Sequence, residues 1–163
     1  MSNSRQTTGS GVRMAIIALG AAAVVAALAF SSARADSGVV ASGELSAFAT
    51  SSDPSISGRA LMIRTGDGQT IVTVHVEGLG PSTTYGSHVH KQACADNFAD
   101  GHYQHVPGGV VTPPNEIWPA FTTNAAGIGN GRAMVDYTAR PEAMSVVIHA
   151  PGGAKIACAD LQP

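Results

Sequence analysis

The sequence predicts an all-β domain, either a sandwich or a barrel, for the part of the chain that follows residue 35. Short runs of alternating apolar and polar residues recur there, and glycine, proline, serine and threonine separate them. Apolar residues at the three- and four-residue spacing of a helix are nearly absent. We therefore expect about eight strands, one long connection and no internal repeat.

The expected strands all combine apolar alternation with a turn signal at one or both ends. They span residues 39–49, 60–64, 70–76, 85–90, 116–123, 132–138, 144–149 and 156–161. The longest connection, residues 91–115, has no periodicity and is rich in proline and glycine. A loop of this length inside a compact domain usually carries a function.

A hairpin is predicted where the sequence G-D-G-Q separates residues 60–64 from residues 70–76. Glycine supplies the positive φ that such a tight turn needs. In the second arm Val72, Val74 and Val76 share one face, and His75 lies on the other. We expect His75 to be a surface histidine.

The first 35 residues predict a secretory signal peptide. Arg5 and Arg13 form a basic region before an apolar or small-residue run, Met14–Phe30, and Ala33-Arg34-Ala35 fits a small-x-small cleavage pattern. We divide the chain into a signal peptide, residues 1–35, and a domain, residues 36–163, that is secreted or held in the cell envelope or periplasm. An uncleaved membrane anchor is the alternative. If the leader is cleaved, we expect no stable membrane contact.

Charge and cysteine content restrict the partners and the compartment of the exported part. Three of the nine basic residues lie in the leader and all eleven acidic residues follow it, so residues 36–163 carry a net charge of −5. That surface is unsuited to nucleic acid or an anionic membrane. Both cysteines, Cys94 and Cys158, are exported, and an even count in an oxidising compartment favours one disulfide. Two free thiols are the alternative.

Four of the six histidines lie in the stretch Tyr85–His105. His88 and His90 are two residues apart, so in a strand both rings point to one face, with Cβ atoms about 6–7 Å apart. Imidazole binds copper or zinc at roughly 2.0–2.1 Å, and two such rings can therefore converge on one ion. The spacing indicates a metal site, although each histidine alone could be structural.

Several short motifs together resemble the copper/zinc superoxide dismutase family. They follow the family's order and comprise Gly86-Ser87-His88-Val89-His90, Cys94, Gly101-His102-Tyr103, Ala126-Gly127, Val146–His149 and Gly153–Cys158. The resemblance implies an eight-stranded Greek-key β-barrel and a disulfide between Cys94 and Cys158. It also implies that copper is bound by His88, His90, His102 and His149. Four neutral imidazoles are a donor set that suits copper.

The chain departs from the family's pattern at the zinc site. After His102 the loop has only His105, and no aspartate occurs between Asp100 and Asp136. The long loop that the family has before its last cysteine is reduced to eight residues here. We expect zinc to be absent, as in the copper-only branch of bacterial and fungal members. His105 is expected to support a ligand by hydrogen bonding or to be solvated, with a role as a spare ligand as the alternative.

Lys155 occupies the position of the family's anion-binding arginine. It keeps the positive charge but lacks the planar fork of donors, and a solvated turn lysine is the alternative. The resemblance implies a copper-dependent superoxide dismutase that forms oxygen and hydrogen peroxide. In it His102 would leave the metal on reduction and take up a proton, and Lys155 would guide superoxide.

The sequence leaves three other functions open. One is an envelope copper-binding protein with little turnover, which the lysine and the shortened loop favour. The others are a non-catalytic domain that kept only the barrel and the disulfide, and a hydrolytic zinc enzyme. Neither the composition nor the motifs indicate an oligomeric state.

Overall fold

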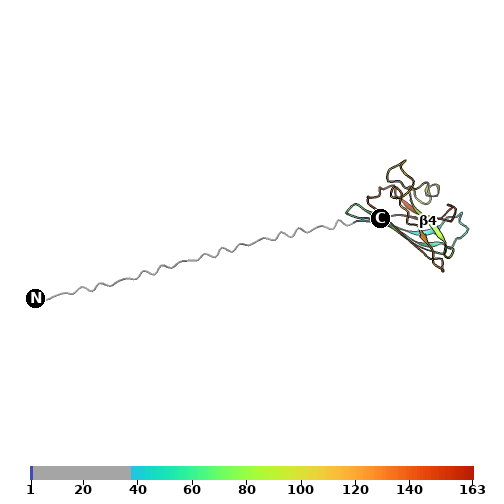
Figure 1. Cartoon of the computed structure of the whole chain (residues 1–163), viewed down its shortest axis with the longest axis horizontal. Helices are drawn as coiled ribbons and strands as arrows, with labels where there is room; N and C mark the ends of the chain where they lie inside the picture. Colours follow the sequence, from blue (N-terminus) through green and yellow to red (C-terminus); the bar gives the residue numbers. More distant parts are fainter. Residues whose placement is uncertain (2–37) are drawn as a thin grey trace. The chain divides into compact units, whose positions relative to one another are not determined.

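A computed structural model describes Met1 and residues 38–163 (Figure 1). Apart from Met1, the predicted signal peptide lies outside the described residues, as does its cleavage point before Asp36. In the described part the regular structure consists of eight strands and one short 3-10 helix, η1 (Asn97–Ala99). None of the described helical residues forms a segment long and apolar enough to cross a membrane.

All eight strands pair antiparallel in one sheet, in the order β5-β4-β7-β8-β1-β2-β3-β6. Their bounds are β1 (Val39–Ala47), β2 (Ser57–Arg64), β3 (Thr70–Glu77), β4 (Thr84–His90), β5 (Phe121–Thr122), β6 (Gly129–Val135), β7 (Ser145–His149) and β8 (Lys155–Asp160). Neighbouring strands such as β4 and β7 are far apart in sequence, so crossover connections join the strands of the sheet. The predicted all-β class and the number of strands are confirmed.

One predicted strand is much shorter than expected. Residues 116–123 contain only the two-residue strand β5. Pro119 lacks a backbone N–H and cannot donate to a ladder. Glu116, at the start of the segment, instead turns its buried side chain toward polar partners.

Two glycines let the ends of the sheet approach each other, and the barrel is nearly closed. A Cβ on Gly129 of β6 would lie 2.3 Å from the ring of Phe121 in β5. On Gly131, a Cβ would lie 2.0 Å from the carbonyl oxygen of Pro119. No larger residue fits at either position without displacing β5 or the chain before it.

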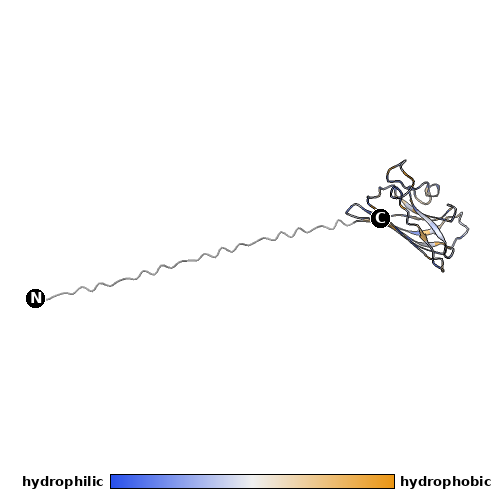
Figure 2. Cartoon of the chain, in the orientation of Figure 1, coloured by the Kyte–Doolittle hydropathy of each residue, from blue (hydrophilic) through white to orange (hydrophobic). Residues whose placement is uncertain are grey.

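The barrel interior contains the apolar positions that the alternation predicted. Val72, Val74 and Val76 of β3 are buried, whereas His75 is exposed and contacts Asn130 and Glu77. Figure 2 shows hydrophobic residues (orange) in strands of the barrel and also in the loop at the top of the view. The hairpin between β2 and β3 is also confirmed, and Gly68 in its turn has φ of +91°.

Cys94 and Cys158 form a disulfide, as predicted, so the alternative of two free thiols is wrong. The bond joins the long connection after β4 to strand β8, across a sequence separation of 64 residues. A closed loop of this length stabilises the folded state by about 4 kcal/mol in the chain-entropy model. The disulfide therefore holds the start of the long connection against the barrel wall.

Candidate metal centre

Four histidines converge at one side of the barrel. Strand β4 supplies His88 and His90 from one face, and His149 ends the adjacent strand β7. His102 comes from the long connection, where it forms an isolated β-bridge with His90. One ring nitrogen from each of the four lies within 4.8 Å of the other three. Residues far apart in sequence are thus brought to a single point.

Three of these rings are oriented by an acceptor at Nδ1. His90 Nδ1 lies 3.1 Å from the carbonyl oxygen of Asp100, and His149 Nδ1 lies 3.0 Å from that of Gly153. His102 Nδ1 lies 2.7 Å from Glu116 Oε2. Each acceptor requires the proton on Nδ1, which leaves the lone pair of Nε2 free to bind a metal.

His88 differs from the other three histidines at Nδ1. Its Nδ1 is buried and has no hydrogen-bond partner among the described residues. A buried nitrogen without a partner is costly unless something else engages it. The His88 ring lies 4.1 Å from the His102 ring and 4.7 Å from the His149 ring, between centroids. The free Nδ1 fits a metal ligand, so the group offers three Nε2 atoms and one Nδ1.

The site favours the neutral form of three of its histidines. Burial, and then repulsion from His102 and His149, lowers the pKa of His88 and of His90 to about 3. Burial also lowers the pKa of His149. Only the neutral form of imidazole can donate its lone pair to a metal. An all-nitrogen set of four such donors fits copper, for which imidazole is a suitable ligand.

Glu116 belongs to this site, although the sequence did not reveal it. Its side chain is 2% exposed and accepts hydrogen bonds from His102, Trp118 and Gln104. Burial opposes ionisation, but these hydrogen bonds outweigh it and hold the pKa of Glu116 below its usual value. Glu116 is therefore a carboxylate that fixes the His102 ring.

Glu116 was not predicted as part of the site because it lies in an apolar segment that was expected to form a strand. A lone acidic residue at the start of E-I-W-P-A-F was the available signal. A carboxylate in such a segment must find buried donors or distort the core.

Lys155 lies beside the site, and its ammonium group donates to the carbonyl oxygens of Phe98 and Asp100. The Asp100 oxygen also accepts from His90, so Lys155 and a ligand candidate share one acceptor. The charge of Lys155 is close enough to disfavour protonation of His90 and His149. Lys155 is half-buried and bound, which does not fit the alternative of a freely solvated turn lysine.

His105 lies apart from the group of four histidines. Its ring stacks on Tyr137 at 3.8 Å between centroids, and its Nδ1 lies 3.3 Å from the Tyr103 hydroxyl. Among the described residues, no hydrogen bond joins His105 to the four histidines. This environment offers no support for the alternative of a spare ligand.

Comparisons with known proteins identify the fold of the barrel. No protein-family model matches the chain, and no curated protein matches it. Among solved structures, a mutant of superoxide dismutase 5 from Candida albicans matches at 16% identity and a TM-score of 0.54. The match covers 77% of this chain and 91% of the other. The chain has the fold of the copper/zinc superoxide dismutases.

Two further structures agree with the superoxide dismutase fold. The Cu(II) form of the Candida albicans enzyme matches at 19% identity and a TM-score of 0.50, over 76% of this chain and 92% of the other. The clock protein EA4 matches at 18% identity and a TM-score of 0.58, over 77% of this chain and 95% of the other. At these identities the likeness establishes the fold, and the chemistry of the site must come from its own residues.

The buried neutral histidines predict a pH-dependent stability for the metal-free protein. Unfolded histidines protonate near pH 6.5, whereas His88 and His90 stay neutral in the fold until about pH 3. Between these values the unfolded state binds more protons. The free energy of unfolding should therefore fall as the pH is lowered from 6.5, by at most about 1.4 kcal/mol per pH unit for each histidine.

Urea unfolding at pH 7, 6 and 5, with a chelator present, measures this dependence. In a His90→Leu variant the slope should become shallower, because one buried neutral histidine is gone. Equal slopes for the two proteins would show that His90 titrates normally in the fold.

Replacing Glu116 by glutamine should weaken metal binding at the four histidines, for which copper is the probe. Glutamine removes the charge that favours the Nδ1–H form of His102, and loss of such a supporting partner typically lowers metal affinity by about 10- to 100-fold. Competition with a chromophoric copper chelator measures the affinity. Glu142→Gln is the matched control, since Glu142 is exposed and pairs with Arg140. Equal affinities for both variants would contradict the role of Glu116.

Proposed function

We propose that residues 36–163 form an exported copper-dependent superoxide dismutase. One observation carries the proposal: four histidine rings converge within a barrel of the superoxide dismutase fold, and among the described residues His88 Nδ1 has no hydrogen-bond partner. The disulfide supports export, because such bonds persist in oxidising compartments. We also propose that the first 35 residues direct export and are removed before Asp36.

In this function His88 would hold copper through Nδ1, and His90, His102 and His149 would hold it through Nε2. Copper bound there would supply a centre that accepts an electron from one superoxide and returns it to the next. The protein's part is to favour the neutral form of His88, His90 and His149 by burial, and to orient His90, His102 and His149 through the acceptors at Nδ1.

His102 is the histidine best placed to hold an additional proton. Its Nδ1–H already faces the Glu116 carboxylate at 2.7 Å, so a proton on Nε2 would create an imidazolium beside a negative charge. His90 and His149 face only backbone carbonyls at Nδ1. His102 is also 30% exposed, which gives its proton a route to solvent or to a product anion.

Lys155 would attract superoxide to the site. The domain carries a net charge of −5, so an approaching anion depends on local positive charge. Two carbonyl oxygens accept hydrogen bonds from the ammonium group, which leaves one of its three N–H bonds for an anion.

Copper alone, without zinc, is proposed for this site. Glu116 already occupies the Nδ1 side of His102, the side that a second metal bridged by this ring would need. Tyr137 covers His105, the other histidine of the loop. The group of four histidines is the one set of three or more potential ligand side chains among the described residues.

The second candidate is a copper-binding envelope protein with little turnover. The hydrogen bonds of Lys155 favour this second candidate. An ammonium group that donates to two carbonyls has less freedom to bind an anion than a planar guanidinium has. Both candidates predict tight copper binding, so only turnover separates them.

Superoxide turnover by the copper-loaded protein is the deciding experiment. We expect the wild type to accelerate dismutation, and a His149→Ala variant to lose most of that activity because one of four ligands is missing. His75→Ala, which changes an exposed histidine away from the site, should retain full activity. If the copper-loaded wild type is no more active than His149→Ala, the protein binds copper but is not a dismutase, and the second candidate is correct. Metal analysis should find copper without stoichiometric zinc.

Removing the charge of Lys155 should slow the reaction and weaken its salt dependence. Attraction between Lys155 and superoxide raises the encounter rate, and added salt screens it. We expect kcat/KM of Lys155→Met to fall several-fold, up to about tenfold, with a shallower decline in salt. Lys155→Arg should keep the salt dependence. If the decline with salt is the same in Lys155→Met as in wild type, Lys155 does not steer the anion.

A further inference from the structure

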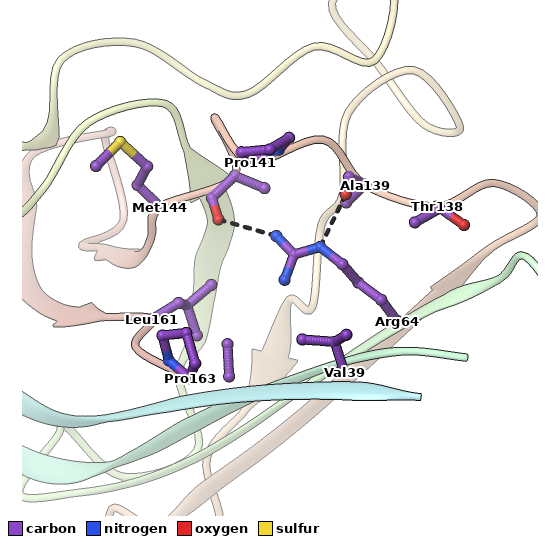
Figure 3. A pocket seen from close by; sticks show the side chains of 10 residues that line it. Val39, Arg64, Thr138, Ala139, Pro141, Met144, Leu161 and Pro163 are labelled. Carbon is purple, nitrogen blue, oxygen red and sulfur yellow. Dashed lines mark hydrogen bonds between the residues drawn. The ribbon is translucent and has the colours of Figure 1, made fainter. Parts of the chain in front are cut away.

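An apolar cavity of about 480 Å³ lies in the barrel domain outside the candidate metal centre, and we call it the Arg64 pocket (Figure 3). It is bounded by the start of β1, the end of β2, the segment between β6 and β7, and the last residues of the chain. None of the four converging histidines lines it. Its apolar walls include Val39, Ala41, Ala143, Met144 and Leu161.

Arg64 is the one charged side chain among the residues that line this cavity. Its Nε donates to the Ala139 carbonyl at 2.8 Å, and its Nη2 donates to the carbonyls of Arg140 and Ala143 at 3.3 and 3.5 Å. These bonds hold the planar guanidinium in one orientation. Figure 3 shows the remaining nitrogen on the side of Val39 and Leu161, away from the bonded carbonyls.

The remaining nitrogen, Nη1, makes no hydrogen bond to any described residue. Among the described residues no carboxylate forms an ion pair with Arg64. Burial lowers the pKa of Arg64, but a guanidinium remains charged in proteins. The cavity thus presents two guanidinium N–H donors that have no hydrogen-bond partner among the described residues, beside mostly apolar walls.

These features define the ligand chemistry. A guanidinium edge recognises a carboxylate, and walls without other polar side chains except Thr138 favour a hydrocarbon or aromatic body. The volume lies within the range of small-molecule sites. We propose that the Arg64 pocket binds a small organic monocarboxylate with an apolar body. This inference does not depend on the metal centre or on the proposed dismutase activity.

Decanoate is a suitable probe, with decyltrimethylammonium and decan-1-ol as probes of matched chain length. Titration calorimetry should show saturable binding of one decanoate per chain, and at least about tenfold weaker binding of the other two. Amide chemical shifts measured by NMR should move at Val39, Ala143 and Leu161. Equal binding of all three probes, or no saturable binding of decanoate, would overturn the proposal.

Two substitutions test the role of the charge. Arg64→Gln should weaken decanoate binding by about tenfold or more, while Arg59→Gln, an exposed arginine on the same strand, should leave it unchanged. Because Arg64 also braces three carbonyls, Met144→Glu provides a second test that leaves those bonds in place. It adds a carboxylate at the partly exposed Met144 and should weaken decanoate binding by a similar factor.

The alternative occupant of this face is a second copy of the chain. Sedimentation velocity over a range of concentrations distinguishes the two. We expect a monomer whose mass does not change with decanoate. A dimer that Met144→Glu dissociates, together with no decanoate binding, would contradict the proposal and identify the cavity as part of an interface.

Discussion

The hydrogen bonds at Nδ1 of His90, His102 and His149 decide which nitrogen each ring presents to the centre of the group. Without them each imidazole could rotate or change tautomer, and four histidines near one another would not constitute a site. The acceptors are two backbone carbonyls and one buried carboxylate, each on a different segment. The rest of the domain serves to hold those segments in place, and His88 adds a fourth ring whose Nδ1 has no hydrogen-bond partner among the described residues.

The carbonyl of Asp100 shows how much structure such an acceptor requires. Residues 97–100 all have φ between +48° and +63°, a range that residues other than glycine rarely adopt and that strains the backbone. Lys155 binds two carbonyls of this segment, Lys91 pairs with the Asp100 side chain at 3.0 Å, and the disulfide anchors the chain just before it. The segment is strained but held from several sides, which is typical of functional positions. Loss of the disulfide should therefore disturb His90 as well as global stability.

Much of the fold was predictable because it depends on local alternation and on turn chemistry. The hairpin of β2 and β3 follows from valines on one face and a glycine-containing turn. The two-residue strand β5 was not predictable, since its length depends on Pro119, on the fit of Gly129 against Phe121 and on the buried partners of Glu116. His88 and His90 were recognisable as a pair from their spacing. His102 and His149 were named from a family resemblance, and the structure brings them to the same point. The hydrogen bond between Glu116 and His102 and the stacking of His105 on Tyr137 could not be predicted. Both depend on contacts between distant segments, which the periodicity of the sequence does not indicate.

We propose that the four histidines form one copper site, with His88 bound through Nδ1 and the others through Nε2. A crystal structure of the copper-loaded protein, with anomalous diffraction measured at the copper edge, would show the ligand atoms. We expect a single strong anomalous peak within bonding distance, roughly 2.0–2.4 Å, of those nitrogens, with Glu116 still bound to His102 Nδ1. A peak elsewhere, coordination by His88 through Nε2, or a second metal at the Nδ1 side of His102 would show that the four histidines do not form this site.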